Sequence, residues 1–114
     1  MSKRNAITAA PPYQVEQTLK LLGANLRTAR LARNLSIEAA AAKIGVGYRA
    51  VATAEAGKAT TAIGVYLSLL WAYDLLGQMS DVAEPARDPQ VLRAAREVRE
   101  RAYPTKRGAL DNDF

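Results

Sequence analysis

Cysteine and histidine are both absent from this 114-residue chain, and aromatic residues make up only 6% of it. Without cysteine the chain has no disulfide and no thiolate that could bind a metal ion. Its carboxylates are scattered singly, so the sequence offers no acid–base pair, thiol nucleophile or metal-ligand cluster at a useful spacing. We therefore expect a protein that is not an enzyme and that needs neither a metal nor a cofactor.

Long hydrophobic runs are missing as well. No stretch approaches the roughly 20 apolar residues that span a bilayer, and residues 1–12 lack the apolar core of a secretory signal. The length fits one small domain with tails, so no separate effector domain remains to sense a small molecule. The sequence favours a cytoplasmic, bacterial-type protein with no membrane partner.

Positive charge is distributed unevenly. The chain carries a net charge of +5, yet residues 1–58 hold nine Lys and Arg against three Asp and Glu. Residues 59–114 hold seven basic and eight acidic residues, so the whole excess lies in the first half. A localised basic excess is typical of a protein with a polyanionic partner such as DNA.

Hydrophobic periodicity and capping residues predict helices only. We expect them over about residues 13–33, 37–43, 48–55, 62–76 and 89–102. Asp88 followed by proline marks the start of the last helix, and Gly77 is expected to end the one before it. The predicted organisation is a flexible N-terminal arm, a main domain, a linker with the C-terminal helix, and a flexible tail, over residues 1–12, 13–80, 81–102 and 103–114 respectively.

The segment from residue 36 to residue 55 predicts two short helices joined by a sharp turn. The hydroxyl of Ser36 can accept a backbone N–H at the start of the first helix, and Gly45 permits the turn after it. The second helix presents three side chains on one side: Tyr48, Arg49 and Thr53. Two helices in this arrangement form a helix-turn-helix, whose second helix fits a major groove.

Arg30 continues an apolar helical stripe. The members of that stripe are spaced by four, three and four residues: Val15, Leu19, Leu22 and Leu26. A guanidinium on or beside the buried face needs a partner, because an unpaired buried charge is costly. Glu55 is the only acidic residue between positions 39 and 73, so it is the expected partner. The alternative is two independently solvated charges.

The predicted helix over residues 62–76 is apolar nearly all round. One face suits the core of the domain, and a second apolar face remains, which includes Val65, Leu69, Tyr73 and Leu76. A helix that is apolar on all sides is buried on two of them. We favour a homodimer whose interface contains these four residues. The alternative is that the helix over residues 89–102 covers them.

This spaced pattern resembles the helix-turn-helix domain of the Cro/lambda-repressor (Xre) family. The resemblance covers residues 22–76 and is carried by Leu22-Gly23, Leu26-Arg27, Arg30, Leu35-Ser36, Ala41, Ile44-Gly45-Val46, Val51, Glu55 and Gly57-Lys58. It implies an all-α fold: a five-helix lambda-repressor-like helix-turn-helix domain, here with an extra C-terminal helix and flexible tails. It also implies that Arg30 pairs with Glu55.

The resemblance further implies the contacts with DNA. Bases are read by Tyr48, Arg49 and Thr53, and phosphates are contacted near Ser36, Gly47 and Lys58. The sequence departs from the family at two positions. Ile37 stands where the family often has Gln, and Gly47 where it often has Ser or Thr, so two side-chain contacts to phosphate are expected to be missing.

The layout of the whole chain resembles HipB-type antitoxins. The resemblance is carried by the linker Glu84-Pro85-Ala86-Arg87-Asp88-Pro89, the basic helix after it and the terminal Leu110-Asp111-Asn112-Asp113-Phe114. It implies a dimeric repressor that binds a near-palindromic operator, autoregulates its operon and binds a HipA-like Ser/Thr kinase toxin. Leu110 and Phe114 are then the expected toxin-binding anchors. The alternative is a stand-alone Xre-type or phage-like regulator without a toxin partner.

Overall fold

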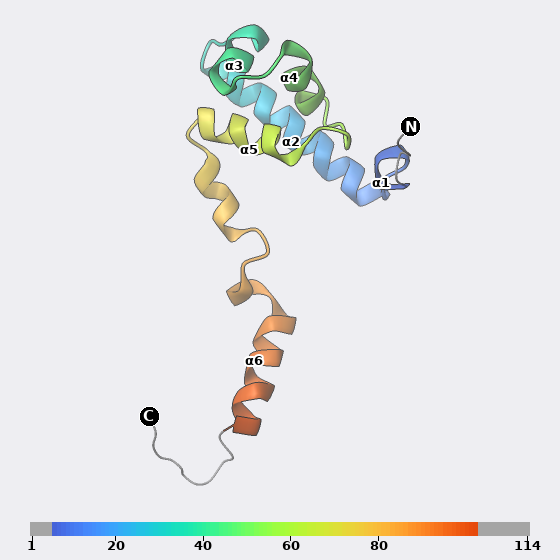
Figure 1. Cartoon of the computed structure of the whole chain (residues 1–114), viewed down its shortest axis with the longest axis vertical. Coiled ribbons are helices and arrows are strands. Elements are labelled where there is room, and N and C mark those ends of the chain that lie inside the picture. Colours follow the sequence, from blue (N-terminus) through green and yellow to red (C-terminus); the bar gives the residue numbers. More distant parts are fainter. Residues whose placement is uncertain (1–5, 103–114) are drawn as a thin grey trace. The chain divides into compact units, whose positions relative to one another are not determined.

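The computed structural model describes residues 6–102, and every regular element in that range is helical (Figure 1). The α-helices are α1 (Ala6–Ala9), α2 (Tyr13–Ala32), α3 (Ile37–Ile44), α4 (Tyr48–Glu55), α5 (Ile63–Ala72) and α6 (Pro89–Ala102). Two 3-10 helices, η1 (Leu76–Asp81) and η2 (Pro85–Arg87), lie between α5 and α6. The predicted all-α fold is confirmed. None of these helices is long and apolar enough to cross a membrane.

Three boundaries differ from those expected from the sequence. Residues 6–9, placed in a flexible arm, form the short helix α1. The chain divides into two compact units after Gly77, not after residue 80. The helix expected to reach residue 76 ends at Ala72, because Asp74 adopts a left-handed backbone conformation with a φ of 61°. The predicted tail over residues 103–114 lies outside the described residues.

Among the described residues, four of the five α-helices of the first unit end in the same way. Each is followed by a residue with positive φ: Asn34, Gly45, Gly57 and Asp74 after α2, α3, α4 and α5 respectively. The next backbone N–H then donates to a carbonyl five residues earlier, as from Val46 to Ala41 and from Lys58 to Thr53. This bond satisfies a carbonyl that the helix leaves unpaired. It also turns the chain sharply, so the connections between these helices are short.

The core of the first unit lies between α2, α3, α4 and α5. Its fully buried members include Leu26, Ala40, Val51, Ala54, Leu69 and Tyr73. Leu69 is 0% exposed and Tyr73 is 1% exposed, so both belong to the core of their own chain. Their assignment to a dimer interface was wrong, because periodicity shows that a helix has two apolar faces but not which one its own chain covers. Val65 is half-buried and Leu76 is 38% exposed.

Arg33 joins the end of α2 to the end of α5. Its guanidinium donates to the carbonyls of Ala29 at 2.9 Å and Tyr73 at 2.8 Å, and lies 5.4 Å from the centre of the Tyr73 ring. A cation at the C-terminal end of a helix satisfies its carbonyls and interacts favourably with its dipole. No local sequence pattern predicted this contact, because residues 33 and 73 are far apart in the chain.

The hydroxyl of Tyr73 is buried and has no hydrogen-bond partner among the described residues. The pKa of Tyr73 is raised, mainly by burial and further by the charge of Glu55, so the phenol remains protonated at neutral pH. An unpaired buried hydroxyl contributes nothing to stability and costs desolvation energy. The aromatic ring of Tyr73, not its hydroxyl, is therefore what stabilises the core.

We expect Tyr73→Phe to leave the free energy of unfolding unchanged or to raise it by up to about 1 kcal/mol. Tyr66→Phe is the matched control, because the hydroxyl of Tyr66 donates to the Lys58 carbonyl at 2.9 Å. That change should lower the free energy of unfolding by about 1 kcal/mol. Urea denaturation measures the free energy of unfolding of both variants. An equal decrease in the two would show that the Tyr73 hydroxyl is also hydrogen-bonded.

The second unit contains η2 and α6. Asp88 accepts the backbone N–H of Gln90 at 2.9 Å through its carboxylate, so it caps α6 as the sequence predicted. Every residue of α6 is at least partly exposed, and the charged side chains of the helix are all exposed. Arg87 forms ion pairs with Asp81 and Glu84 at 3.9 and 3.6 Å. Such exposed pairs stabilise a fold only weakly.

Candidate nucleic-acid interface

The turn between α3 and α4 contains three residues, and its conformation follows from its glycines. Gly45 has a φ of 73°, which an L side chain rarely adopts. Gly47 then precedes α4 in an extended conformation. At the start of α3 the Ser36 hydroxyl accepts the N–H of Ala39 at 3.0 Å, as the sequence predicted. The two short helices therefore pack against each other and α4 begins at the surface.

Arg30 and Glu55 form a buried ion pair that joins α2 to the end of α4. The guanidinium Nε lies 2.6 Å from one carboxylate oxygen of Glu55, and Nη2 lies 3.0 Å from the other. Both side chains are only 7% exposed. The hydrogen bond to Glu55 raises the pKa of Arg30 despite its burial. The expected pairing is confirmed, and two independently solvated charges are excluded.

The remaining donor of Arg30 holds the loop after α2. Its Nη1 donates to the carbonyl of Leu35 at 2.8 Å. One guanidinium therefore connects α2, the connection to α3, and α4. Planar, bidentate pairing of this kind is specific to arginine among the basic residues.

Two glycines let backbones meet at the same end of α4. A Cβ atom on Gly23 would lie 2.5 Å from the carbonyl oxygen of Glu55. A Cβ atom on Gly57 would lie 2.5 Å from the carbonyl oxygen of Leu19. Both distances are far below any ordinary contact, so α2 approaches the C-terminal end of α4 and the residues just after it more closely than side chains would allow. The C-terminal end of α4 is thus fixed by an ion pair and two backbone contacts.

The outer face of α4 carries the residues expected to read bases. Tyr48 is 53% exposed and Arg49 is also exposed, and both lie in the first turn. Thr53 is half-buried and its hydroxyl donates to the Ala50 carbonyl at 3.1 Å, so it is less available than expected. Ala52 follows Tyr48 by four residues on the same face and is half-buried. Sequence reasoning missed Ala52, although helical spacing alone could have identified it.

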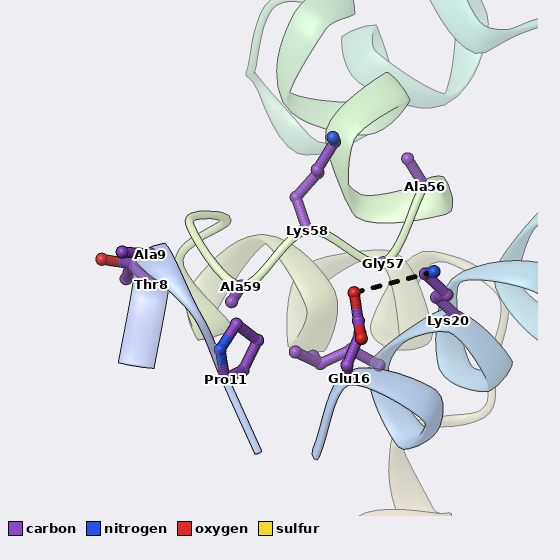
Figure 2. A pocket seen from close by; sticks show the side chains of 10 residues that line it. Thr8, Ala9, Pro11, Glu16, Lys20, Ala56, Gly57, Lys58 and Ala59 are labelled. Carbon is purple, nitrogen blue, oxygen red and sulfur yellow. Dashed lines mark ion pairs between the residues drawn. The ribbon is translucent and has the colours of Figure 1, made fainter. Parts of the chain in front are cut away.

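The expected phosphate contacts lie at three separate points. Ser36 and Gly47 are exposed at the starts of α3 and α4, and α4 has no side-chain cap. Lys58 is exposed, while its backbone is held by bonds to the Thr53 carbonyl and from the Tyr66 hydroxyl. Figure 2 shows the Lys58 side chain extending away from Pro11 and Glu16. Sequence reasoning missed the negative charge of Glu38 in the first turn of α3, which disfavours a phosphate at Ser36.

A small pocket lies beside Lys58, between α1, the first turns of α2 and the residues after α4 (Figure 2). The pair Glu16–Lys20, at 3.7 Å, lines one side of it, and alanine, glycine and proline line much of the rest. The pocket was not expected, because α1 was not. Within residues 6–102 no cluster of three or more acidic side chains could hold a metal ion.

Comparison with protein-family models, with curated proteins and with solved structures finds no match to this chain. What the site can do therefore follows from its own geometry. The exposed first turn of α4 carries an arginine and a tyrosine. A glycine precedes the helix and a lysine follows it. Together these residues can contact a polyanion and form hydrogen bonds with planar polar groups.

Proposed function

We propose that this protein is a sequence-specific DNA-binding repressor with a helix-turn-helix of the Cro/lambda-repressor type, acting as a homodimer on a near-palindromic operator. One observation carries the proposal. The C-terminal end of α4 is fixed by the buried pair of Arg30 with Glu55, while its first turn presents Tyr48 and Arg49 to solvent. A rigidly held helix with its first turn exposed is what major-groove reading requires.

The chemistry of the exposed face suits DNA. Arg49 can make a bidentate contact with guanine, Tyr48 can donate or accept a hydrogen bond, and the methyl group of Ala52 can contact a thymine methyl. Gly47 leaves room for a phosphate to approach the backbone N–H groups at the start of α4. Lys58 supplies a positive charge after the same helix, and the first half of the chain carries the basic excess.

Arg49→Ala is expected to abolish the preference for operator over scrambled DNA while weak, salt-sensitive binding remains. The loss of discrimination should be roughly 1–3 kcal/mol. Lys58→Ala should instead weaken both DNAs alike and reduce the slope of log affinity against log salt by about one. Arg93→Ala is the charge-matched control, because it removes one exposed arginine from α6. Fluorescence anisotropy at several salt concentrations measures all three, and an unchanged operator preference in Arg49→Ala would reject the proposed readout.

The antitoxin role stays a prediction. Its expected anchors, Leu110 and Phe114, lie outside the described residues. The geometry described above therefore supports the proposal of DNA binding and gives no support for or against a toxin partner. A HipA-like kinase encoded beside this protein would favour the antitoxin. Its absence would favour a stand-alone Xre-type or phage-like regulator.

A further inference from the structure

The connecting segment between α4 and α5, residues 56–62, is shaped by two backbone hydrogen bonds at Lys58. The N–H of Lys58 donates to the carbonyl of Thr53 at 3.1 Å. The N–H of Thr61 donates to the carbonyl of Lys58, also at 3.1 Å. Both bonds join residues that are close together in the chain, so they shape the segment without attaching it to α2 or to the buried part of α5.

Tyr66 attaches the connecting segment to the core. Its hydroxyl donates to the Lys58 carbonyl at 2.9 Å, so this carbonyl accepts one bond from within the segment and one from α5. Tyr66 is only 4% exposed, and a buried side chain is held in one rotamer by its neighbours. The hydroxyl at the end of the ring is therefore a fixed point, and it holds the Lys58 carbonyl in place.

The residue before Lys58 is held by α2. Gly57 is buried, and a Cβ atom on it would lie 2.5 Å from the Leu19 carbonyl oxygen, so its backbone packs directly against that of α2. Lys58 thus has a fixed neighbour on one side and a fixed carbonyl on the other. Its side chain, in contrast, is exposed and extends away from Pro11 and Glu16 (Figure 2).

A fixed backbone matters for a cation that contacts phosphate. A lysine side chain has high rotamer entropy, and each freedom that is lost on binding lowers the affinity. When the backbone is anchored beforehand, only the side-chain torsions of Lys58 have to be ordered on the polyanion. Without the anchor, the connecting segment would have to be ordered as well, and the same contact would contribute less to affinity.

We propose that Tyr66 is a positioning residue for DNA binding, whose hydroxyl holds the backbone of Lys58 so that the lysine ammonium group is placed to contact a phosphate. The inference rests on the proposed function, because it takes Lys58 to contact DNA. Tyr66 itself is buried and does not contact DNA. It contributes to affinity and not to the choice of operator, because phosphate contacts carry no direct sequence information.

A double-mutant cycle in DNA affinity tests the coupling between the two residues. Tyr66→Phe removes the hydroxyl and keeps the ring, and it should weaken binding to operator and to scrambled DNA alike by roughly two- to tenfold. In the Lys58→Ala background the same change should weaken binding by less than about twofold, because no cation is left to position. An equal loss in the two backgrounds would overturn the proposal.

Leu69→Ile is the control for the stability that Tyr66→Phe loses. It changes a fully buried residue of the same helix at nearly constant volume, which has a modest effect on stability. Its DNA affinity should equal that of the natural protein when both are fully folded, at a temperature well below their unfolding midpoints. If Leu69→Ile weakened DNA binding as much as Tyr66→Phe, general destabilisation would explain the loss and the proposal would fall.

The mobility of Lys58 is a readout that needs no DNA. In the natural protein the backbone N–H of Lys58 should have an NMR order parameter near the value of rigid backbone, about 0.85. In Tyr66→Phe it should fall towards about 0.6, the upper limit for flexible segments, while the order parameters of α4 stay unchanged. A Lys58 order parameter that is the same in both proteins would overturn the proposal.

The two measurements separate this inference from the proposed function. A protein that prefers its operator but shows no coupling between Tyr66 and Lys58 would keep the function and overturn the inference. A protein that binds neither operator nor scrambled DNA would reject the function and the phosphate contact of Lys58 together, even if the order parameters showed that Tyr66 anchors the connecting segment.

Discussion

Glu55→Ala is expected to lower the free energy of unfolding by about 3–5 kcal/mol. The substitution leaves the Arg30 guanidinium buried, with the Leu35 carbonyl as its one remaining hydrogen-bond acceptor among the contacts described above. Arg30 cannot lose its proton to escape the cost, since an arginine side chain is effectively always protonated in proteins. Urea denaturation at neutral pH measures the loss.

Two controls separate burial of the charge from loss of a contact. Glu16→Ala breaks the exposed pair with Lys20, in which the Glu16 side chain is 45% exposed. This change should lower the free energy of unfolding by no more than about 1 kcal/mol. The double variant Arg30→Met with Glu55→Leu removes both charges and should recover much of the stability lost by Glu55→Ala. If Glu55→Ala were no more destabilising than Glu16→Ala, the pair would be solvated in solution.

Gly57→Ala is expected to be the next most damaging change. Its backbone φ of 69° is strained for alanine, which costs roughly 1–2 kcal/mol. In addition, the new Cβ atom would lie 2.5 Å from the Leu19 carbonyl oxygen and 2.6 Å from the Lys20 Cα atom. Both are backbone atoms and cannot rotate away, so overpacking adds about 1–3 kcal/mol. α2 and the segment after α4 must then separate.

Gly45→Ala is the matched control for that change. Gly45 has a similar φ of 73°, but a Cβ atom there meets nothing within 4 Å. Gly45→Ala should therefore lower the free energy of unfolding by the conformational strain alone, roughly 1–2 kcal/mol. Thermal unfolding of the two variants gives the difference, which isolates the contact between backbones. An equal loss at both positions would show that the close approach at Gly57 relaxes without cost.

The sequence predicted the parts of this structure that depend on local pattern. Helical spacing placed Arg30 beside the core, and the scarcity of carboxylates made Glu55 its partner. Ser36 and Asp88 were identified as caps because their side chains act on residues two or three positions away. These features need no knowledge of how distant segments meet.

The features that the sequence did not predict depend on contacts between segments that are distant in the chain. The bond from Arg33 to the Tyr73 carbonyl joins residues forty positions apart, and no spacing rule reveals it. Leu69 and Tyr73 were assigned to the wrong side of α5, because an apolar helix looks the same from both sides until its packing is known. Asp74 ended α5 early because an acidic residue adopted the backbone conformation expected of a glycine.

The C-terminal end of α4 is fixed, and this leaves the first turn of the helix free to vary in sequence. Four residues hold the C-terminal end of α4 against α2 through close backbone contacts and one buried ion pair: Gly23, Arg30, Glu55 and Gly57. Tyr48 and Arg49 take no part in that packing. Mutation can therefore replace these two exposed side chains one at a time while the protein stays folded. Natural variation, or a designed library confined to the first turn of α4, can therefore sample new side chains at these positions without disrupting the fold.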